Sequence, residues 1–163
     1  MDPFLPDIIQ SVVGRIGAKV GFPVFFDKGN LSQVSKSVAV NNSFPLVWLR
    51  MPFTAKRGDP HLYGVMMCDL FIAMPTDSNY TQQLREDINY KPKLLPVYQE
   101  FLRQLQIEKK FWFTGIGAIE HSMTIMPYWG GGAIEGTNAK NMFEKEIDAI
   151  GITGLKLTVR KNC

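Results

Sequence analysis

The sequence predicts an α+β fold, in which a mostly antiparallel sheet with a long central β-hairpin is packed by two or three helices. Two long apolar runs, residues 44–53 and 63–76, flank a polar loop and predict the two strands of the hairpin. Apolar residues recur with helical spacing over 6–20 and 96–105, which predicts helices that pack on the sheet. With 163 residues the chain can bury a proper core, so we expect one α+β domain over residues 1–163.

The central hairpin is more apolar than a sheet with one solvent-exposed face requires. In such a strand apolar and polar residues alternate, because successive side chains point to opposite faces. The stretches 46–49 and 70–74 do not alternate. We therefore expect both faces of the hairpin to be covered, the second by a helix, another sheet layer or a neighbouring subunit. A buried helix is the alternative for the second run. Met66, Met67 and Met74 suit either ordinary core or an adaptable contact surface.

The first half of the chain holds the other expected elements. Apolar residues at every third or fourth position place a helix at 6–20. A short strand is expected at Pro23–Asp27, and the polar, turn-rich stretch 28–43 is expected to be a loop. A helix that starts near Asp77 should end at Lys91, because the following proline disfavours helical backbone in the residue before it.

The second half begins with the clearest helix of the chain. Pro96 fits its first turn, and its apolar stripe runs from Val97 to Leu105. The remaining expectations are an aromatic loop anchor at 111–113, a strand at 120–126, a flexible segment at 127–132, a short helix-compatible segment at 138–143 and a final strand at 147–159 that is bulged at Gly154.

Composition and charge narrow the class of protein. A hydrophobic content of 45% and a charged content of 20% are globular values. The 18 basic and 15 acidic residues leave a net charge of +3, which is too mild to indicate a nucleic-acid-binding protein. No stretch reaches the roughly 18 apolar residues of a membrane span, and the N-terminus lacks a signal-peptide pattern. With only Cys68 and Cys163, no disulfide framework is expected, as in a reducing cytoplasm.

No recognisable catalytic, cofactor or metal motif stands out in the sequence. His61 and His121 are far apart, and neither has the close spacing of a metal-binding motif. Residues 115–117 (GIG) form only half of a dinucleotide fingerprint. The acidic residues of 144–148 are expected to form a solvated face, and Asp69, inside an apolar run, must find a partner. We therefore expect no enzyme activity, no cofactor and no metal.

The charged tip of the hairpin and an aromatic pair ahead of three glycines are the expected contact regions. A charged tip suits salt bridges with a partner, and the aromatic pair suits a contact loop. The alternative is a small cytoplasmic enzyme or ligand-binding domain, with a site near Asp69, His121, Tyr128 and Trp129 and with the glycines as a lid. The candidate interface residues are Lys56, Arg57, Asp59, His61, Tyr128 and Trp129.

The order of these elements resembles that of tail terminators and related tail-completion (neck) proteins of tailed bacteriophages, including phages of gut Bacteroidetes. The resemblance covers Phe44–Leu105, the segment 148–159 and Cys163. It implies a virion structural protein, assembled in the host cytoplasm and located in the tail or neck. It implies a homo-oligomeric ring, often hexameric, that contacts the tail tube and the neck or connector proteins, without sequence-specific nucleic-acid or membrane binding. It rests on element order and assigns no residue a role.

Overall fold

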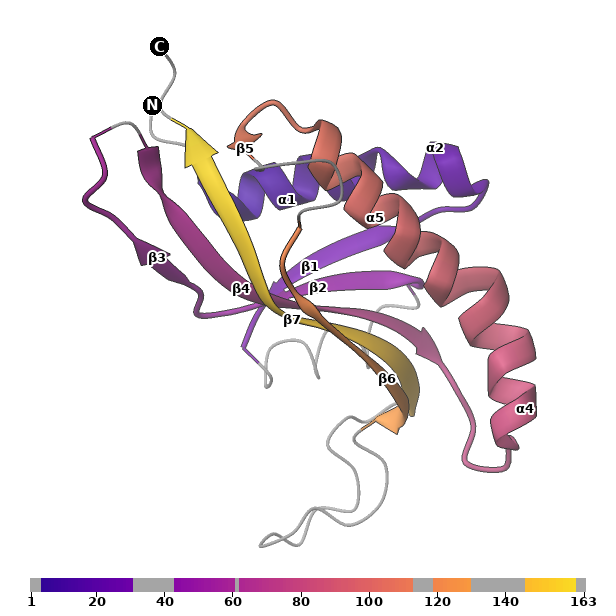
Figure 1. Cartoon of the computed structure of the whole chain (residues 1–163). Helices are drawn as coiled ribbons and strands as arrows, with labels where there is room; N and C mark the ends of the chain where they lie inside the picture. Colours follow the sequence, from indigo (N-terminus) through magenta and orange to yellow (C-terminus); the bar gives the residue numbers. More distant parts are fainter. Residues whose placement is uncertain (1–3, 31–42, 61, 113–118, 130–145, 161–163) are drawn as a thin grey trace, which may run out of the picture.

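A computed structural model describes residues 4–30, 43–60, 62–112, 119–129 and 146–160 of the chain (Figure 1). These residues form an α+β fold with one seven-stranded sheet, as the sequence predicts. The helices are α1 (Leu5–Gly14), α2 (Ile16–Val20), α4 (Gln82–Arg85), the π-helix η1 (Glu86–Leu94) and α5 (Leu95–Ile107). The strands are β1 (Phe25–Gly29), β2 (Leu46–Arg50), β3 (Thr54–Lys56), β4 (Leu62–Pro75), β5 (Phe111–Trp112), β6 (Ser122–Trp129) and β7 (Ile147–Arg160).

Two strands of 14 residues each, β4 and β7, form the spine of the sheet and pair antiparallel along almost their whole length. At one end of this ribbon, β2 and then β1 join the C-terminal half of β4, while β6 joins the N-terminal half of β7. At the other end, β3 pairs with β4 and β5 pairs with β7. Figure 1 shows the β3–β4 hairpin reaching away from the helices.

The sheet is mixed, which corrects the expectation of a mostly antiparallel sheet in one respect. Strand β1 runs parallel to β2, with Phe25 opposite Leu46 and Gly29 opposite Arg50. Parallel neighbours need a crossover of a dozen or more residues, and the 16 residues between Gly29 and Leu46 are long enough for one. All other pairings between the described strands are antiparallel.

The long central hairpin is confirmed, with one break. Its second run is the single strand β4, so the helical alternative for that run is wrong. Its first run holds β2, and a second short strand, β3, lies at Thr54–Lys56, where the sequence predicts a polar loop; both strands pair with β4. All four residues of 46–49 are buried, as are those of 70–73, so coverage on both faces is confirmed for this half of the hairpin. The other half is not covered on both faces, because β3 is exposed throughout and Met67 is 49% exposed.

One face of the sheet carries the main core. Helices α1, α2, η1 and α5 contribute apolar side chains that pack against every second residue of β2, β4 and β7. Figure 1 shows the helices gathered on one side of the sheet. The stripe predicted for α5 is confirmed for Val97, Phe101 and Leu105, which are buried, whereas Leu102, the fourth predicted member, is only partly buried. Arg15 separates α1 from α2 where the sequence predicts one helix, and the left-handed Gly21 (φ 84°) ends α2.

The opposite face carries a smaller aromatic core. Trp48 of β2 stacks on Phe71 of β4, with ring centroids 5.1 Å apart, and Phe71 stacks on Trp129 of β6 at 4.6 Å. Leu46, Ala73 and Ile147 are buried in the same cluster. Met67 also lies on this face, because the neighbouring Met66 points into the main core and successive side chains of a strand point to opposite faces; the Met67 side chain is exposed.

The expected helix stop at Lys91 is wrong. Helix α4 continues through Pro92 as the nine-residue π-helix η1 and runs directly into α5. Proline cannot donate the backbone bond, and in an α-helix its ring clashes with the carbonyl four residues earlier. A π-helix uses wider turns that bond five residues apart, which relieves that clash. Buried Asn89 and Tyr90 hold this wide turn on the sheet.

The expected bulge at Gly154 is confirmed, and it explains Asp69. The pairing of β4 with β7 slips between Cys68 and Leu70, so that Thr153 and Gly154 together face Asp69. Gly154 has φ 62°, which glycine adopts without strain, and its N–H donates to the Asp69 Oδ1 at 2.9 Å. Asp69 therefore has a partner in the fold, as its place in an apolar strand requires.

Several expected boundaries shift. The first short strand lies at 25–29, two residues later than predicted. The strand predicted at 120–126 is β6, which includes 127–129, so these residues are not a flexible segment. Phe111 and Trp112 form β5 and not a loop anchor. The loop at 31–42, Phe113, the glycines 130–132, the segment 138–143 and Cys163 lie outside the described residues. None of the described helices is long and apolar enough to cross a membrane.

Candidate interaction surfaces

The charged hairpin tip is exposed. Residues 54–60 are all exposed, including Lys56, Arg57 and Asp59, and Lys56 still pairs with Val65 in the sheet. The tip therefore stands on a two-stranded base that extends from the body of the sheet. His61 lies outside the described residues.

Tyr128 and Trp129, the other predicted contact residues, are partly buried within the chain's own fold. Trp129 packs on Phe71, and the Tyr128 hydroxyl donates to Glu146 Oε1 at 2.9 Å. This bond is the main reason that the pKa of the Tyr128 hydroxyl is raised. Tyr128 has φ 50°, a left-handed backbone, where the pairing of β6 with β7 slips. Trp129 thus belongs to the aromatic core, and both residues lie at the end of β6, where the strand packs within the chain's own fold.

The irregular end of β6 is held by a buried carboxylate that the sequence interpretation missed. Asp148 is fully buried, so the expectation of a solvated acidic face is wrong for this residue. Its Oδ1 accepts from the Tyr128 N–H at 2.9 Å, and its Oδ2 accepts from the Asn89 Nδ2 at 2.8 Å. Arg85 Nε lies 3.3 Å from Oδ1, and the Arg85 guanidinium also lies over the Tyr128 ring.

This carboxylate therefore connects three elements: β7, which carries it, the end of β6, and the α4–η1 helix. Arg85 is fixed further by donating from Nη2 to the Asp77 carbonyl at 2.9 Å. Tyr90 donates to the Ala149 carbonyl at 3.2 Å, and its pKa is raised, first by burial and then by the charge of Asp148. The network is fully partnered and structural in character.

The four residues of the alternative ligand-binding site are not brought together. Asp69 is bonded to the bulge, whereas His121 lies on the helix-covered side and contacts the Tyr98 hydroxyl at 2.8 Å. His121 is seven residues of extended chain from Tyr128, or roughly 20 Å. Among the residues that the structure describes, no group of three or more His, Cys, Asp or Glu side chains is placed to hold a metal ion.

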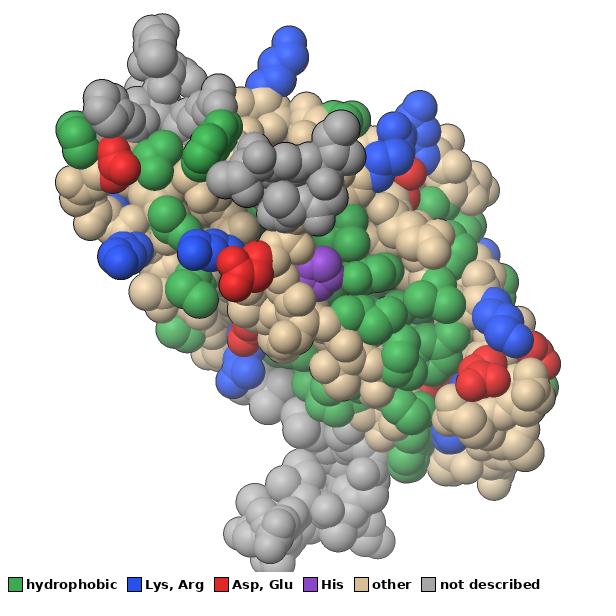
Figure 2. Space-filling view, viewed as in Figure 1, with side chains coloured by type: hydrophobic (Ala, Val, Ile, Leu, Met, Phe, Trp, Pro, Cys, Tyr) green, Lys and Arg blue, Asp and Glu red, His purple; other side chains and the backbone are tan. Residues whose placement is uncertain are grey.

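An exposed apolar surface on β6 is formed by Met123 and Ile125, and we name it the β6 strip. Met123 and Ile125 are 38% and 42% exposed, and they lie two residues apart on one side of the strand. They face the same side as Ile152 and Ile150, their partners on β7, and so lie on the helix-covered side. Figure 2 shows hydrophobic side chains gathered beside His121 over this region.

Helix α5 forms the other border of the β6 strip. Its residue Tyr98 reaches His121 at the start of β6, and Leu95 and Leu102 are only partly buried. These three residues are three and four positions apart, so they share one side of α5. Within the described residues β6 pairs only with β7, so β6 is an edge strand next to an exposed apolar surface. Edge strands of this kind are templates for contact with another chain.

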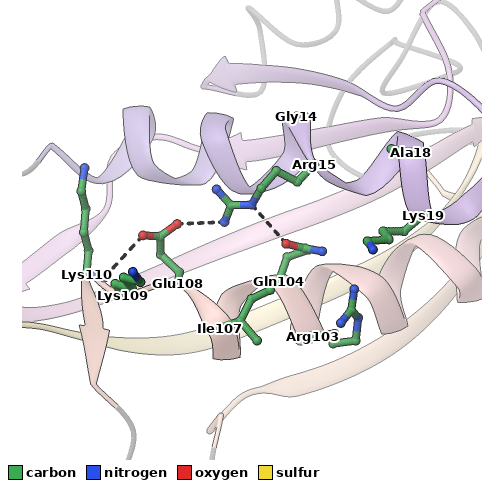
Figure 3. A pocket seen from close by; sticks show the side chains of 10 residues that line it. All are labelled: Gly14, Arg15, Ala18, Lys19, Arg103, Gln104, Ile107, Glu108, Lys109 and Lys110. Carbon is green, nitrogen blue, oxygen red and sulfur yellow. Dashed lines mark hydrogen bonds and ion pairs between the residues drawn. The ribbon is translucent and has the colours of Figure 1, made fainter.

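A second surface is a groove between the α1–α2 helices and the C-terminal end of α5, with a volume of about 880 Å³ (Figure 3). Arg15, at the junction of α1 and α2, spans it by donating to Gln104 Oε1 at 3.1 Å and to Glu108 Oε2 at 2.8 Å. On α5, Arg103 donates to the Glu100 carboxylate, and this bond is the main reason that the pKa of Glu100 is lowered. The hydrogen bond from Gln104 and the positive charge of Lys19 lower this pKa further.

Comparison of the chain with protein-family models, and with curated proteins, returns no match.

The Cys68 thiol provides a probe of unfolding. It is buried on the helix-covered side, and burial, together with the charge of Asp69, raises its pKa to about 12. The thiolate is the reactive form, so we expect a Cys163→Ser variant to react with a thiol reagent at pH 8 only as fast as it unfolds. Labelling rates measured over a urea series check this expectation, and rapid labelling of the native protein would contradict it.

The same thiol gives a pH dependence with a definite sign. The folded pKa is raised above the ordinary value of 9.0, so the contribution to stability is complete below pH 9. It is lost between pH 9 and about 12, because the unfolded thiol ionises there and the folded one does not. A Cys68→Ala control should lose less stability over this range in urea titrations.

Proposed function

We propose that this chain is a virion structural protein of a tailed phage, a ring-forming tail terminator or head–tail neck component that joins the tail tube to the capsid connector. The order of helix, short strand, apolar hairpin, helix and closing strands supports the proposal through its resemblance to that family. The observation that carries it is the β6 strip, an exposed apolar surface on an edge strand. Such a surface suits lasting contact with another protein chain.

A ring requires two different contact surfaces on each subunit, because each copy meets its neighbours head to tail. The chain has two such surfaces in separate parts of the sheet. The β6 strip lies beside the N-terminal half of β7, and the hairpin tip with Lys56, Arg57 and Asp59 lies beyond the opposite end of the β4–β7 ribbon. In the proposed ring one surface contacts the preceding copy and the other contacts the next.

The proposed partners are further copies of the chain, the tail tube and the neck or connector proteins. The proposed location is the tail or neck of the virion, after assembly in the host cytoplasm. The proposed role is structural and involves no enzyme activity.

Light scattering at micromolar concentration, with and without purified tail tubes, tests the proposal. We expect the native chain to form particles whose mass is a multiple of 18.4 kDa, either alone or on the tubes. Ile125→Asp places a charge on the β6 strip and should prevent assembly. Phe25→Asp is the matched control, because Phe25 is 39% exposed, close to the value for Ile125, but lies on β1 at the other edge of the sheet from β6. Arg57→Glu should disturb assembly through the tip.

Thermal unfolding should be nearly the same for all three variants, since each replaces an exposed side chain. A native chain that remains a strict monomer and also fails to associate with tail tubes would refute the proposal. If Arg57→Glu alone assembles normally, the tip is ordinary surface and the β6 strip has a different counterpart.

A further inference from the structure

The groove between α1–α2 and α5 has a mainly apolar floor and a charged rim. Gly14 and Ala18 line it from one side, and Ile107 lines it from the other. Ile107 is 57% exposed, the highest value among the large apolar side chains that the structure describes as exposed. Figure 3 shows Arg15, Gln104 and Glu108 meeting in the space between the helices, with Ile107 on α5 beside them. An exposed apolar residue in a concave surface is a natural anchor point for a partner's side chain.

The rim is basic. Five cationic side chains line the groove: Arg15, Lys19, Arg103, Lys109 and Lys110. One carboxylate, Glu108, also lines the groove, and Glu100 adjoins it through its bond to Arg103; their side chains are only 13% and 15% exposed. Each is already bonded by an arginine, Glu108 by Arg15 and Glu100 by Arg103. A ligand that enters the groove therefore meets the cations more than the carboxylates.

The five lining cations, with Glu108 in the lining and Glu100 beside it, hold a local charge of +3. The other 13 basic and 13 acidic residues of the sequence cancel. The groove is thus a local concentration of positive charge, in which Arg15 and Arg103 are already paired with carboxylates. Concentration of this kind attracts anionic partners more strongly than the mild overall charge indicates.

We propose that this groove binds an acidic segment of a partner protein, with carboxylates on the basic rim and an apolar side chain against Ile107. A helix or extended peptide between two helices is a common mode of peptide recognition. Nucleic acid is the less favoured anion. Single strands bind through stacking on aromatic rings, and the lining residues that the structure describes include no aromatic side chain. In addition, the apolar side chain of Ile107 can neither donate a hydrogen bond to a phosphate nor pair with its charge.

The groove is formed by α1, α2 and α5 and shares no residue with the β6 strip or the hairpin tip. This inference therefore stands apart from the proposed ring.

Fluorescence anisotropy tests the groove. The probe is a fluorescein-labelled amphipathic helix about four turns long, with glutamates on one face and leucines on the other. We expect it to bind the full chain, and to bind less tightly as salt increases. Lys19→Glu/Lys109→Glu/Lys110→Glu should weaken binding by roughly tenfold or more, if each rim charge contributes up to about 1 kcal/mol.

The control is Lys28→Glu/Lys91→Glu/Lys156→Glu, three exposed lysines outside the groove, the β6 strip and the hairpin tip. Both triple variants change the net charge from +3 to −3, so an effect of overall charge alone would be equal in the two. The control should stay within about twofold of the native affinity, and circular dichroism should show that both variants fold. Ile107→Ser should also weaken binding, because it removes the apolar anchor without changing charge.

Four results would overturn the inference. They are equal loss of binding in the two triple variants, equal binding of a probe with glutamines in place of glutamates, no binding of the probe by the native chain, and tighter binding of labelled single-stranded or duplex DNA that depends on the same three lysines. The last result would assign the groove to nucleic acid instead.

Discussion

Asp148→Ala is expected to destabilise the protein by about 3–5 kcal/mol, because it removes the carboxylate at the centre of a buried polar network. Asp148 is fully buried and Arg85 is only 11% exposed, so the guanidinium loses its counter-charge where water cannot replace it. The Tyr128 N–H and one bond of Asn89 also lose their acceptor. Urea unfolding followed by circular dichroism measures the loss.

Asp87→Ala is the matched control. Asp87 pairs with Lys91 at 3.6 Å, but both side chains are more than half exposed, so this change should cost less than about 1 kcal/mol. A double-mutant cycle of Asp148→Asn with Arg85→Gln then separates the ion pair from the hydrogen bonds. A loss below 1 kcal/mol for Asp148→Ala would show that the network is not needed to hold β6 and η1 on β7.

Trp48→Ala is expected to cost about 3–5 kcal/mol, the range for removing a large buried aromatic side chain. Trp48 is 3% exposed on the face of the sheet opposite the main core. It stacks on Phe71, and its Nε1 donates to the Gly29 carbonyl at 3.0 Å, which fastens β1 to β2. Unfolding in urea should shift to lower concentration, and the near-ultraviolet dichroism of the aromatic cluster should fall.

Trp112→Ala is the comparison for this change. Trp112 lies on the two-residue strand β5 and is 41% exposed, so less apolar surface returns to water on its removal. We expect a loss of stability at most half that of Trp48→Ala. Equal losses of stability for the two tryptophans would mean that burial of Trp48 in the aromatic cluster contributes no more to stability than a partly exposed tryptophan does.

The two features read most directly from the sequence were the doubly covered hairpin and the bulge. The stretches 46–49 and 70–73 are apolar at consecutive positions, and a strand with consecutive apolar residues has no face to give to water. Gly154 interrupts the alternation of the last strand, and glycine is the residue that a left-handed bulge position favours. In both cases local physics determines the outcome.

Features that depend on distant partners could not be predicted. The sequence of residues 25–29 does not indicate that β1 pairs with β2 or that the two strands run parallel. The partner and the direction of the strand depend on the path of the connection between them. The continuous helix through Pro92 depends on Asn89 and Tyr90, whose partners Asp148 and Ala149 are 59 residues away. The local rule for proline was sound, and tertiary contacts outweighed it.

The candidate contact residues divide in the same way. Charge placed Lys56, Arg57 and Asp59 on the surface, where the structure has them. Tyr128 instead hydrogen-bonds to Glu146 and Asp148, and Trp129 stacks on Phe71. These partners are distant in sequence, so the sequence alone could not indicate them. The available signal for Asp148 was its position between Ile147 and Ala149, inside an apolar stretch, and not its nearness to other acidic residues.

Strand β7 has a consequence for how the chain folds. It is the last strand in sequence, yet it pairs with β4, β5 and β6 and lies at the centre of the sheet. During synthesis, the apolar strand β4 leaves the ribosome about 70 residues before its long partner exists. The two layers of core cannot close until residues 147–160 arrive. Formation of the sheet thus depends on pairing between segments far apart in sequence, which slows folding relative to a fold built from local contacts.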